Sequence, residues 1–183
     1  MGFAYNANKF VEMVLHVADL LKEDRYGGAT KLNKVLFFVE FEHLRRHHQV
    51  ISGCEFQKLP HGPAPRQLKP VRDQLIESGE AKLVQEEFLD KTLDRLIPLR
   101  SANLALFSKD EMQTISEVVD SLKGITTAGV SELSHQEPGW QLAEEGETIP
   151  YSAAFFNCPQ VRTPTTDRLL DSVAKRYGLV ADK

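Results

Sequence analysis

Apolar residues recur at helical spacing in the first quarter of the chain and predict two helices. Over residues 7–23 they lie three or four positions apart, with polar residues on the other side. Tyr26, Gly27 and Gly28 interrupt this pattern, and Thr30 is expected to cap a second helix by accepting a hydrogen bond from a free backbone N–H. That helix carries two apolar rows, so we expect it to be buried between neighbours on both sides. The rows contain Leu32, Val35, Leu36 and Val39 on one side and Phe37, Phe38, Phe41 and Leu44 on the other.

The rest of the pattern predicts shorter elements. Three prolines exclude regular helix from residues 49–65, which we expect to be extended and loop-like. Residues 68–76 favour a third helix that ends before Gly79, and residues 82–88 and 92–99 favour a β-hairpin.

Two further helices are expected in the second half of the body. Ser108 and Glu111 have the spacing of a capping box, and the helix that they open ends at Gly124. A shorter helix covers residues 127–136 and ends at Pro138 and Gly139.

A last helix is predicted after Pro164, because proline suits the first position of a helix. Its apolar stripe consists of Leu169, Leu170, Val173 and Tyr177. The fold class is therefore mainly α: a compact helical domain over residues 1–150 with one small β-hairpin, plus a C-terminal helical extension over residues 151–183.

Composition and charge narrow the classes of function. No apolar run reaches the roughly 18 residues of a membrane span, and no signal-peptide pattern is present. Cys54 and Cys158 form no CxxC motif, which favours a reduced, cytoplasmic protein. The net charge of −4 argues against a nucleic-acid partner, and an acidic body suits a basic one.

One set of side chains could hold a metal. Glu40, His43 and His47 fall on one face of the second helix, and a carboxylate with two imidazoles is a ligand set that suits zinc. Arg45 and Arg46 lie between these positions and would repel a cation, so a solvated helix end is the favoured interpretation and no cofactor is expected.

For each of the other candidate groups a structural or solvated role is the favoured interpretation. His61 and His135 could take part in acid–base chemistry, but neither lies near a nucleophile motif, so a structural role is favoured. A basic strip could contact phosphates, although it lacks aromatic residues; its members are Lys58, Arg66, Lys69 and Arg72. Trp140, the single tryptophan, could anchor a partner, but packing on the core is favoured.

Three short motifs resemble those of the Panacea domain, also called the SocA-like or phage-associated GepA-like domain, of bacterial antitoxins. The first is Lys-Leu-Asn-Lys-Val-Leu-Phe-Phe over residues 31–38. The second is His61-Gly62-Pro63, with histidine where the family has an aromatic residue. The third combines Leu133-Ser134-His135 with Trp140. Their order and spacing extend the resemblance over about residues 10–149.

The resemblance implies a protein that binds a co-encoded toxin and has no active site. The toxin would be blocked directly or delivered to a protease, and a chaperone is a further implied partner. The partner-binding candidates are then the motif residues and the stripe of the last helix: His61, Gly62, Pro63, Ser134, His135, Trp140, Leu169, Leu170, Val173 and Tyr177.

Two other functions stay open from the sequence alone. One is a metal-dependent hydrolase that uses Glu40, His43 and His47. The other is a nucleic-acid-binding regulator of its own operon, although no helix-turn-helix pattern is recognisable.

Overall fold

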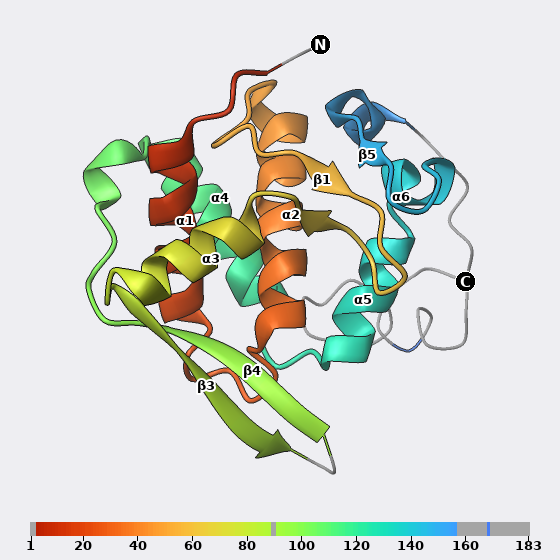
Figure 1. Ribbon diagram of the computed structural model, residues 1–183. Coiled ribbons are helices and arrows are strands. Elements are labelled where there is room, and N and C mark those ends of the chain that lie inside the picture. The colour runs from red at the N-terminus through yellow and green to blue at the C-terminus, as the bar shows by residue number, and fades with distance from the viewer. Residues whose placement is uncertain (1–2, 89–90, 157–167, 169–183) are drawn as a thin grey trace.

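Helix α2 (Ala29–His47) runs through the middle of the protein and is surrounded by the other elements (Figure 1). The computed structural model describes residues 3–88, 91–156 and 168. Helices α1 (Ala7–Leu20), α4 (Lys109–Leu122) and α5 (Thr127–His135) all contact α2. None of the described helices is long and apolar enough to cross a lipid bilayer.

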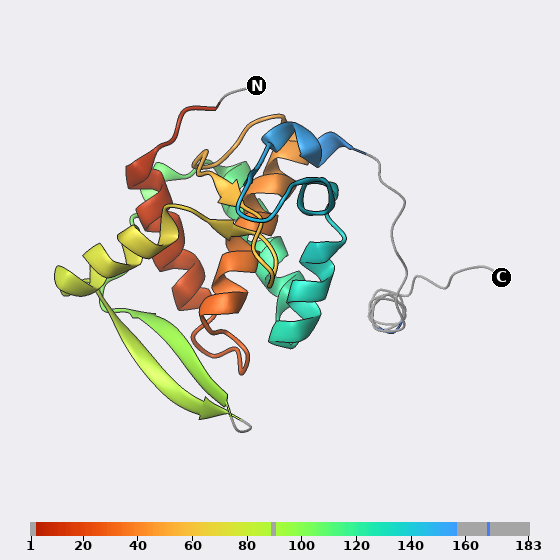
Figure 2. The ribbon, with the colours of Figure 1, turned by 45° about the vertical axis from the view of Figure 1, so that its right-hand side comes forward.

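Two small antiparallel sheets accompany the helices. Strands β3 (Ala81–Phe88) and β4 (Lys91–Pro98) form a hairpin that projects from the body (Figure 2). The second sheet has the order β2-β1-β5 and joins distant parts of the chain. Its strands are β1 (Phe56–Gln57), β2 (Ala64–Pro65) and β5 (Thr148–Ile149).

Four short elements complete the fold. They are α3 (Leu68–Glu77), α6 (Pro138–Leu142) and the 3₁₀ helices η1 (Leu104–Leu106) and η2 (Tyr151–Phe155). The last of these packs on α2: the Tyr151 ring stacks on Phe41 with centroids 5.3 Å apart, and its hydroxyl donates to the Cys54 carbonyl at 2.6 Å. Residues 151–156 therefore pack against the body of the protein.

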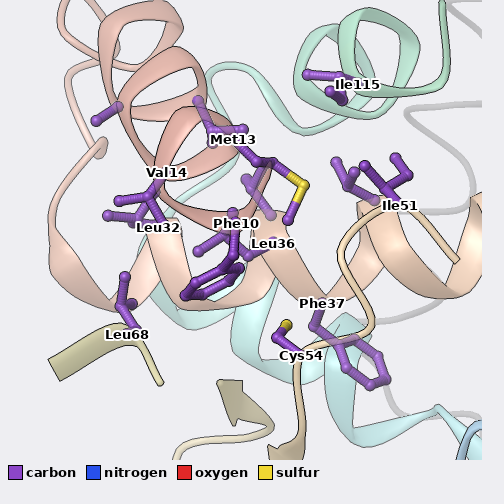
Figure 3. Packing of buried hydrophobic residues seen from close by; sticks show 14 of the residues in the cluster. Phe10, Met13, Val14, Leu32, Leu36, Phe37, Ile51, Cys54, Leu68 and Ile115 are labelled. Carbon is purple, nitrogen blue, oxygen red and sulfur yellow. The ribbon is translucent and has the colours of Figure 1, made fainter. Parts of the chain in front are cut away.

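The core forms where α1, α2 and α4 meet the three-stranded sheet (Figure 3). Both apolar rows of α2 contribute to it, so the prediction of a helix buried on two sides is confirmed. Seven of the eight predicted side chains are at most 5% exposed, while Phe38 is half-buried. The seven are Leu32, Val35, Leu36, Phe37, Val39, Phe41 and Leu44.

The mainly helical fold and the hairpin are confirmed, and so is the Ser108–Glu111 capping box. The prediction that Thr30 caps α2 is wrong, because Gly28 holds the capping position and its carbonyl accepts from Leu32 N at 3.0 Å. The first helix ends at Leu20 rather than at residue 23. Helix α6 and the three-stranded sheet were not predicted, since elements of two to five residues show no periodicity.

A buried ion pair fixes the turn between α1 and α2. Lys31 Nζ lies 2.7 Å from Asp24 Oδ2, and both side chains are at most 1% exposed. Lys31 also donates to the Ile125 carbonyl at 2.9 Å, and Gly124 N donates to Asp24 Oδ2 at 3.1 Å. Burial opposes ionisation of Asp24, but the hydrogen bonds from Lys31, Tyr26 N and Gly124 N prevail and hold the pKa of this carboxyl below its usual value. The pair therefore joins the α1–α2 turn to the α4–α5 turn.

The hairpin is fastened to the same turn from the other side. Arg95 of β4 is 4% exposed, and its Nη1 donates to the carbonyls of Leu21 and Asp24 at 2.9 and 3.0 Å. Glycine is needed here, because a Cβ on Gly27 would lie 2.3 Å from the Leu21 carbonyl oxygen. The base of the hairpin is therefore held by the buried network around Asp24.

We predict that Asp24→Ala lowers the free energy of unfolding by about 3–5 kcal/mol, because it leaves the Lys31 ammonium buried without its counter-ion. The double variant Asp24→Ala/Lys31→Met should lose clearly less than the two single losses added together. Urea denaturation of the four proteins measures this coupling. The exposed Asp19–Lys22 pair provides the control, since Lys22→Met should leave the midpoint unchanged. Strict additivity of the two buried substitutions would contradict the assigned role of the pair.

Candidate functional site

The three predicted motifs meet in space around Gly62. We call this group the motif cluster and define it as Lys34, His61, Gly62, Pro63, Ser134, His135 and Trp140. Lys34 lies on α2, residues 61–63 lie between β1 and β2, and the remaining members lie on α5 and α6. The three motifs, which are far apart along the chain, therefore form one local packing arrangement.

Gly62 forms the closest contacts of the motif cluster. Its φ of +101° is in the region that favours glycine. A Cβ at this position would lie 2.3 Å from Ser134 Oγ and 2.6 Å from Lys34 Cε. The Ser134 hydroxyl donates to the Ser131 carbonyl of the same helix at 2.7 Å, so its hydrogen bond stays within α5. Glycine is required because the loop, α2 and α5 all approach one another at this point.

Trp140 and His135 form the second half of the motif cluster. Their rings stack with centroids 4.0 Å apart and an angle of 16°. The indole Nε1 donates to the Leu59 carbonyl at 3.1 Å, and Lys58 Nζ lies 4.3 Å from the indole ring. Trp140 thus holds the loop that carries residues 58–62 and also packs against the core. The sequence did not identify Leu59, because its contact is made by a backbone carbonyl.

Charge in the motif cluster is predominantly positive. Lys34 is 2% exposed and donates to the Pro63 carbonyl at 3.1 Å. Burial lowers the pKa of Lys34 to about 8. Burial also lowers the pKa of His135, and the positive charge of Lys34 adds to this effect. His135 Nε2 is buried and has no hydrogen-bond partner, so the ring contributes through stacking.

The structure gives the predicted site residues different surroundings. Gly62, Pro63 and Ser134 are buried, His135 and Trp140 are half-buried, and His61 is exposed. The four stripe residues of the last predicted helix, Leu169, Leu170, Val173 and Tyr177, lie outside the described residues. Within the motif cluster, His61 is therefore the side chain presented to solvent.

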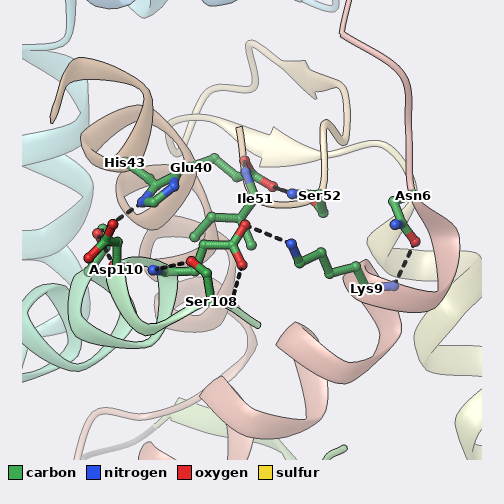
Figure 4. A network of polar contacts seen from close by, with 10 residues as sticks. Asn6, Lys9, Glu40, His43, Ile51, Ser52, Ser108 and Asp110 are labelled. Carbon is green, nitrogen blue, oxygen red and sulfur yellow. Dashed lines mark hydrogen bonds and ion pairs between the residues drawn. The ribbon is translucent and has the colours of Figure 1, made fainter. Parts of the chain in front are cut away.

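The metal-ligand candidates on α2 are held by different partners (Figure 4). Glu40 is fully buried, and its carboxylate accepts from Ile51 N at 2.8 Å, from Ser52 N at 2.7 Å and from the Ser52 hydroxyl. His43 Nδ1 lies 3.0 Å from Thr114 Oγ1, and its ring stacks on His47. Among the described residues, no three side chains of the metal-binding types are placed to share an ion.

Glu40 is instead a structural carboxylate. Burial raises its pKa, while hydrogen bonds from Ser52, Ile51 N and Gly53 N act in the opposite direction. These bonds hold the loop that follows α2. The nearby Cys54 thiol is buried, and burial raises its pKa well above the usual value, which is the reverse of what a nucleophile needs.

The predicted basic strip does not present a row of free cations. Lys69 and Arg72 both pair with Asp73, at 3.0 and 2.7 Å. Arg66 donates to the Gly146 carbonyl at 2.6 Å, and Lys58 donates to the Ala143 carbonyl at 3.0 Å. Phosphate contacts would have to displace these bonds.

We predict that Gly62→Ala destabilises the protein more than Gly79→Ala does. Gly79 also has a positive φ, of +73°, but an added Cβ there meets nothing within 4 Å. Both variants carry the strain of an alanine at positive φ, and Gly62→Ala adds the contact with Lys34 and Ser134. Overpacking of this kind costs about 1–3 kcal/mol. Denaturation midpoints that fall equally in both variants would contradict a tight contact at Gly62.

The buried Lys34 ammonium predicts a pH dependence of stability. An unfolded lysine titrates near pH 10, whereas the folded pKa is about 8, so the unfolded state binds more protons between these values. The unaltered protein should therefore gain stability relative to Lys34→Met as the pH rises from about 8 to about 10. Unfolding measured across this range tests the sign. The exposed Lys22 is the control, because its hydrogen bond to Asp19 shifts its pKa in the opposite direction, upward. The unaltered protein should therefore show no such gain in stability relative to Lys22→Met.

Comparison with known families agrees with the motifs. A family model described as the antitoxin SocA-like, Panacea domain matches residues 32–141, which is more than half of the chain. The matched segment contains every member of the motif cluster. Searches of curated proteins and of solved structures found no match. The match begins in α2, ends in α6 and covers more than half of the chain. This chain therefore belongs to the antitoxin SocA-like, Panacea domain family.

Proposed function

We propose that this protein is an antitoxin that neutralises a co-encoded protein toxin by direct binding as a folded domain. The family match over residues 32–141 is the observation that carries the proposal. The packing of the motif cluster supports a structural use of these residues, because its hydroxyl, ammonium and indole groups all donate to backbone carbonyls. Such groups position the loops of a binding domain.

Direct blocking is the mechanism that we favour over delivery to a protease or chaperone. A domain with a large buried core is preorganised, so it binds without the cost of folding on its partner. We place the pair in the cytoplasm, where two cysteines without a CxxC motif stay reduced. An origin in a phage or prophage fits the same family.

The motif residues then have two roles. Gly62, Pro63 and Ser134 are buried and would act by supporting the fold. His61 is exposed and stays a candidate for contact with the toxin. We propose residues 151–183 as an extension that adapts the domain to its own toxin, with its first residues packed on α2.

Co-expression with the small open reading frame beside its gene tests the proposal. We expect that reading frame alone to stop growth, and we expect this protein to restore growth and to co-purify with the toxin in one complex. An early stop codon in the antitoxin gene provides the control, because it separates the effect of the protein from that of the transcript.

Two results would decide against parts of this proposal. Rescue of growth without a physical complex would contradict direct binding. Loss of the toxin from cells that contain the antitoxin, with the toxin restored when the host proteases are deleted, would favour delivery to a protease.

A further inference from the structure

An exposed group of leucines lies on the side of the protein formed by α1 and η1. Leu99, Leu104 and Leu106 are 55%, 42% and 43% exposed, and all three belong to the segment between β4 and α4. Leu20 at the end of α1 is 37% exposed. We call these four residues the leucine surface. Of these, Leu99 and Leu104 line one cavity, and exposed aliphatic side chains that gather are typical of contact surfaces.

A cavity opens beside two of these residues, Leu99 and Leu104. Its volume is about 420 Å³, and its walls include His16 and Asp19 of α1 together with Leu99, Arg100 and Leu104. The cavity is open to solvent and its walls are mixed: Leu99, Leu104 and Pro98 supply apolar surface, and His16, Asp19 and Arg100 supply polar groups. One side chain of a partner could enter it, and anchors of this kind carry much of the energy of protein interfaces.

The segment that carries the leucines is fixed by polar contacts. The Glu12 carboxylate accepts from both Nη atoms of Arg100 at 2.8 Å and from Asn103 N at 2.7 Å. Arg100 also pairs with Glu80. The leucines are therefore held in an outward orientation, so a partner meets a surface that is already ordered.

The charge beside the cavity is negative. One guanidinium, that of Arg100, is shared by the carboxylates of Glu12 and Glu80, which leaves one negative charge in excess. Asp19 is balanced by Lys22 at 2.9 Å. Burial lowers the pKa of His16 and so disfavours a positive charge on its ring. A basic group on a partner would complement this surface.

We propose that the toxin docks on the leucine surface, with an apolar side chain in the cavity between Leu99 and Leu104 and a Lys or Arg against Glu80. This inference rests on the proposed function and specifies its interface. The excess negative charge of the Glu12–Arg100–Glu80 group favours a basic partner protein as the occupant. Among the described elements, η2 lies across α2 from α1 and does not cover this surface (Figure 1).

The complex from co-expression provides the test. Leu104→Asp should weaken binding of the purified toxin at least about tenfold, and Glu80→Lys should weaken it severalfold and reduce its dependence on salt. Leu83→Asp on the hairpin is the matched control, because Leu83 is 38% exposed and lies outside the leucine surface. Leu142→Asp and His61→Ala probe the rival surface beside the motif cluster. Melting curves check that each variant is folded.

Each outcome decides. Weakened binding by Leu104→Asp and Glu80→Lys, with the other three variants unaffected, supports the inference. Unchanged binding in the leucine-surface variants overturns the inference while the proposed function stands, and so does a loss confined to Leu142→Asp and His61→Ala. A Leu104→Asp variant that changes only the self-association of the free protein identifies a second copy as the occupant and also overturns it. Failure of the unaltered protein to bind any adjacent gene product removes the proposed function and this inference together.

Discussion

The need to pair the polar groups of a buried helix determines much of this structure. Helix α2 lies in the core, yet it carries Lys31, Lys34, Glu40 and His43, each at most 3% exposed. A charge in such a place is costly unless a partner is brought to it. Each of these side chains has a partner in a different connection or helix: the α1–α2 turn, the β1–β2 loop, the loop after α2, and α4. One helix thus positions most of the segments around it, by polar contacts as well as by apolar packing.

The family motifs acquire a physical explanation from this arrangement. Lys31 and Lys34 begin the first motif, and neither reaches solvent. Lys34 needs the carbonyl that follows the glycine of the second motif, and that glycine leaves space for the serine of the third. Trp140 then holds the same loop from the other end. The motifs therefore describe one packed junction around Gly62.

Sequence reasoning succeeded where periodicity is strong and failed where single contacts decide. The apolar repeat of α2 predicted a helix buried on two sides, and the Ser108–Glu111 spacing predicted a capping box, because both depend only on neighbouring residues. The buried ion pair was not predicted, since lysine is most often exposed and its partner comes from the preceding turn. The expectation that Glu40 and His43 lie at a solvated helix end is wrong, because both are buried and the loop at Ile51 and Ser52 takes the Glu40 carboxylate. The cavity beside Leu104 involves residues from α1 and β4, which no local pattern connects.

The single tryptophan gives this protein a built-in optical probe. Trp140 is the one indole in the chain, and it stacks on His135 inside the motif cluster. Indole emission therefore reports the environment of that junction alone, and imidazole in stacking contact with the ring will influence its intensity. Events on the opposite side of α2 reach this signal only if they are transmitted through the core. Fluorescence thus distinguishes a local change at the junction from a change on the far side of the molecule without any added label.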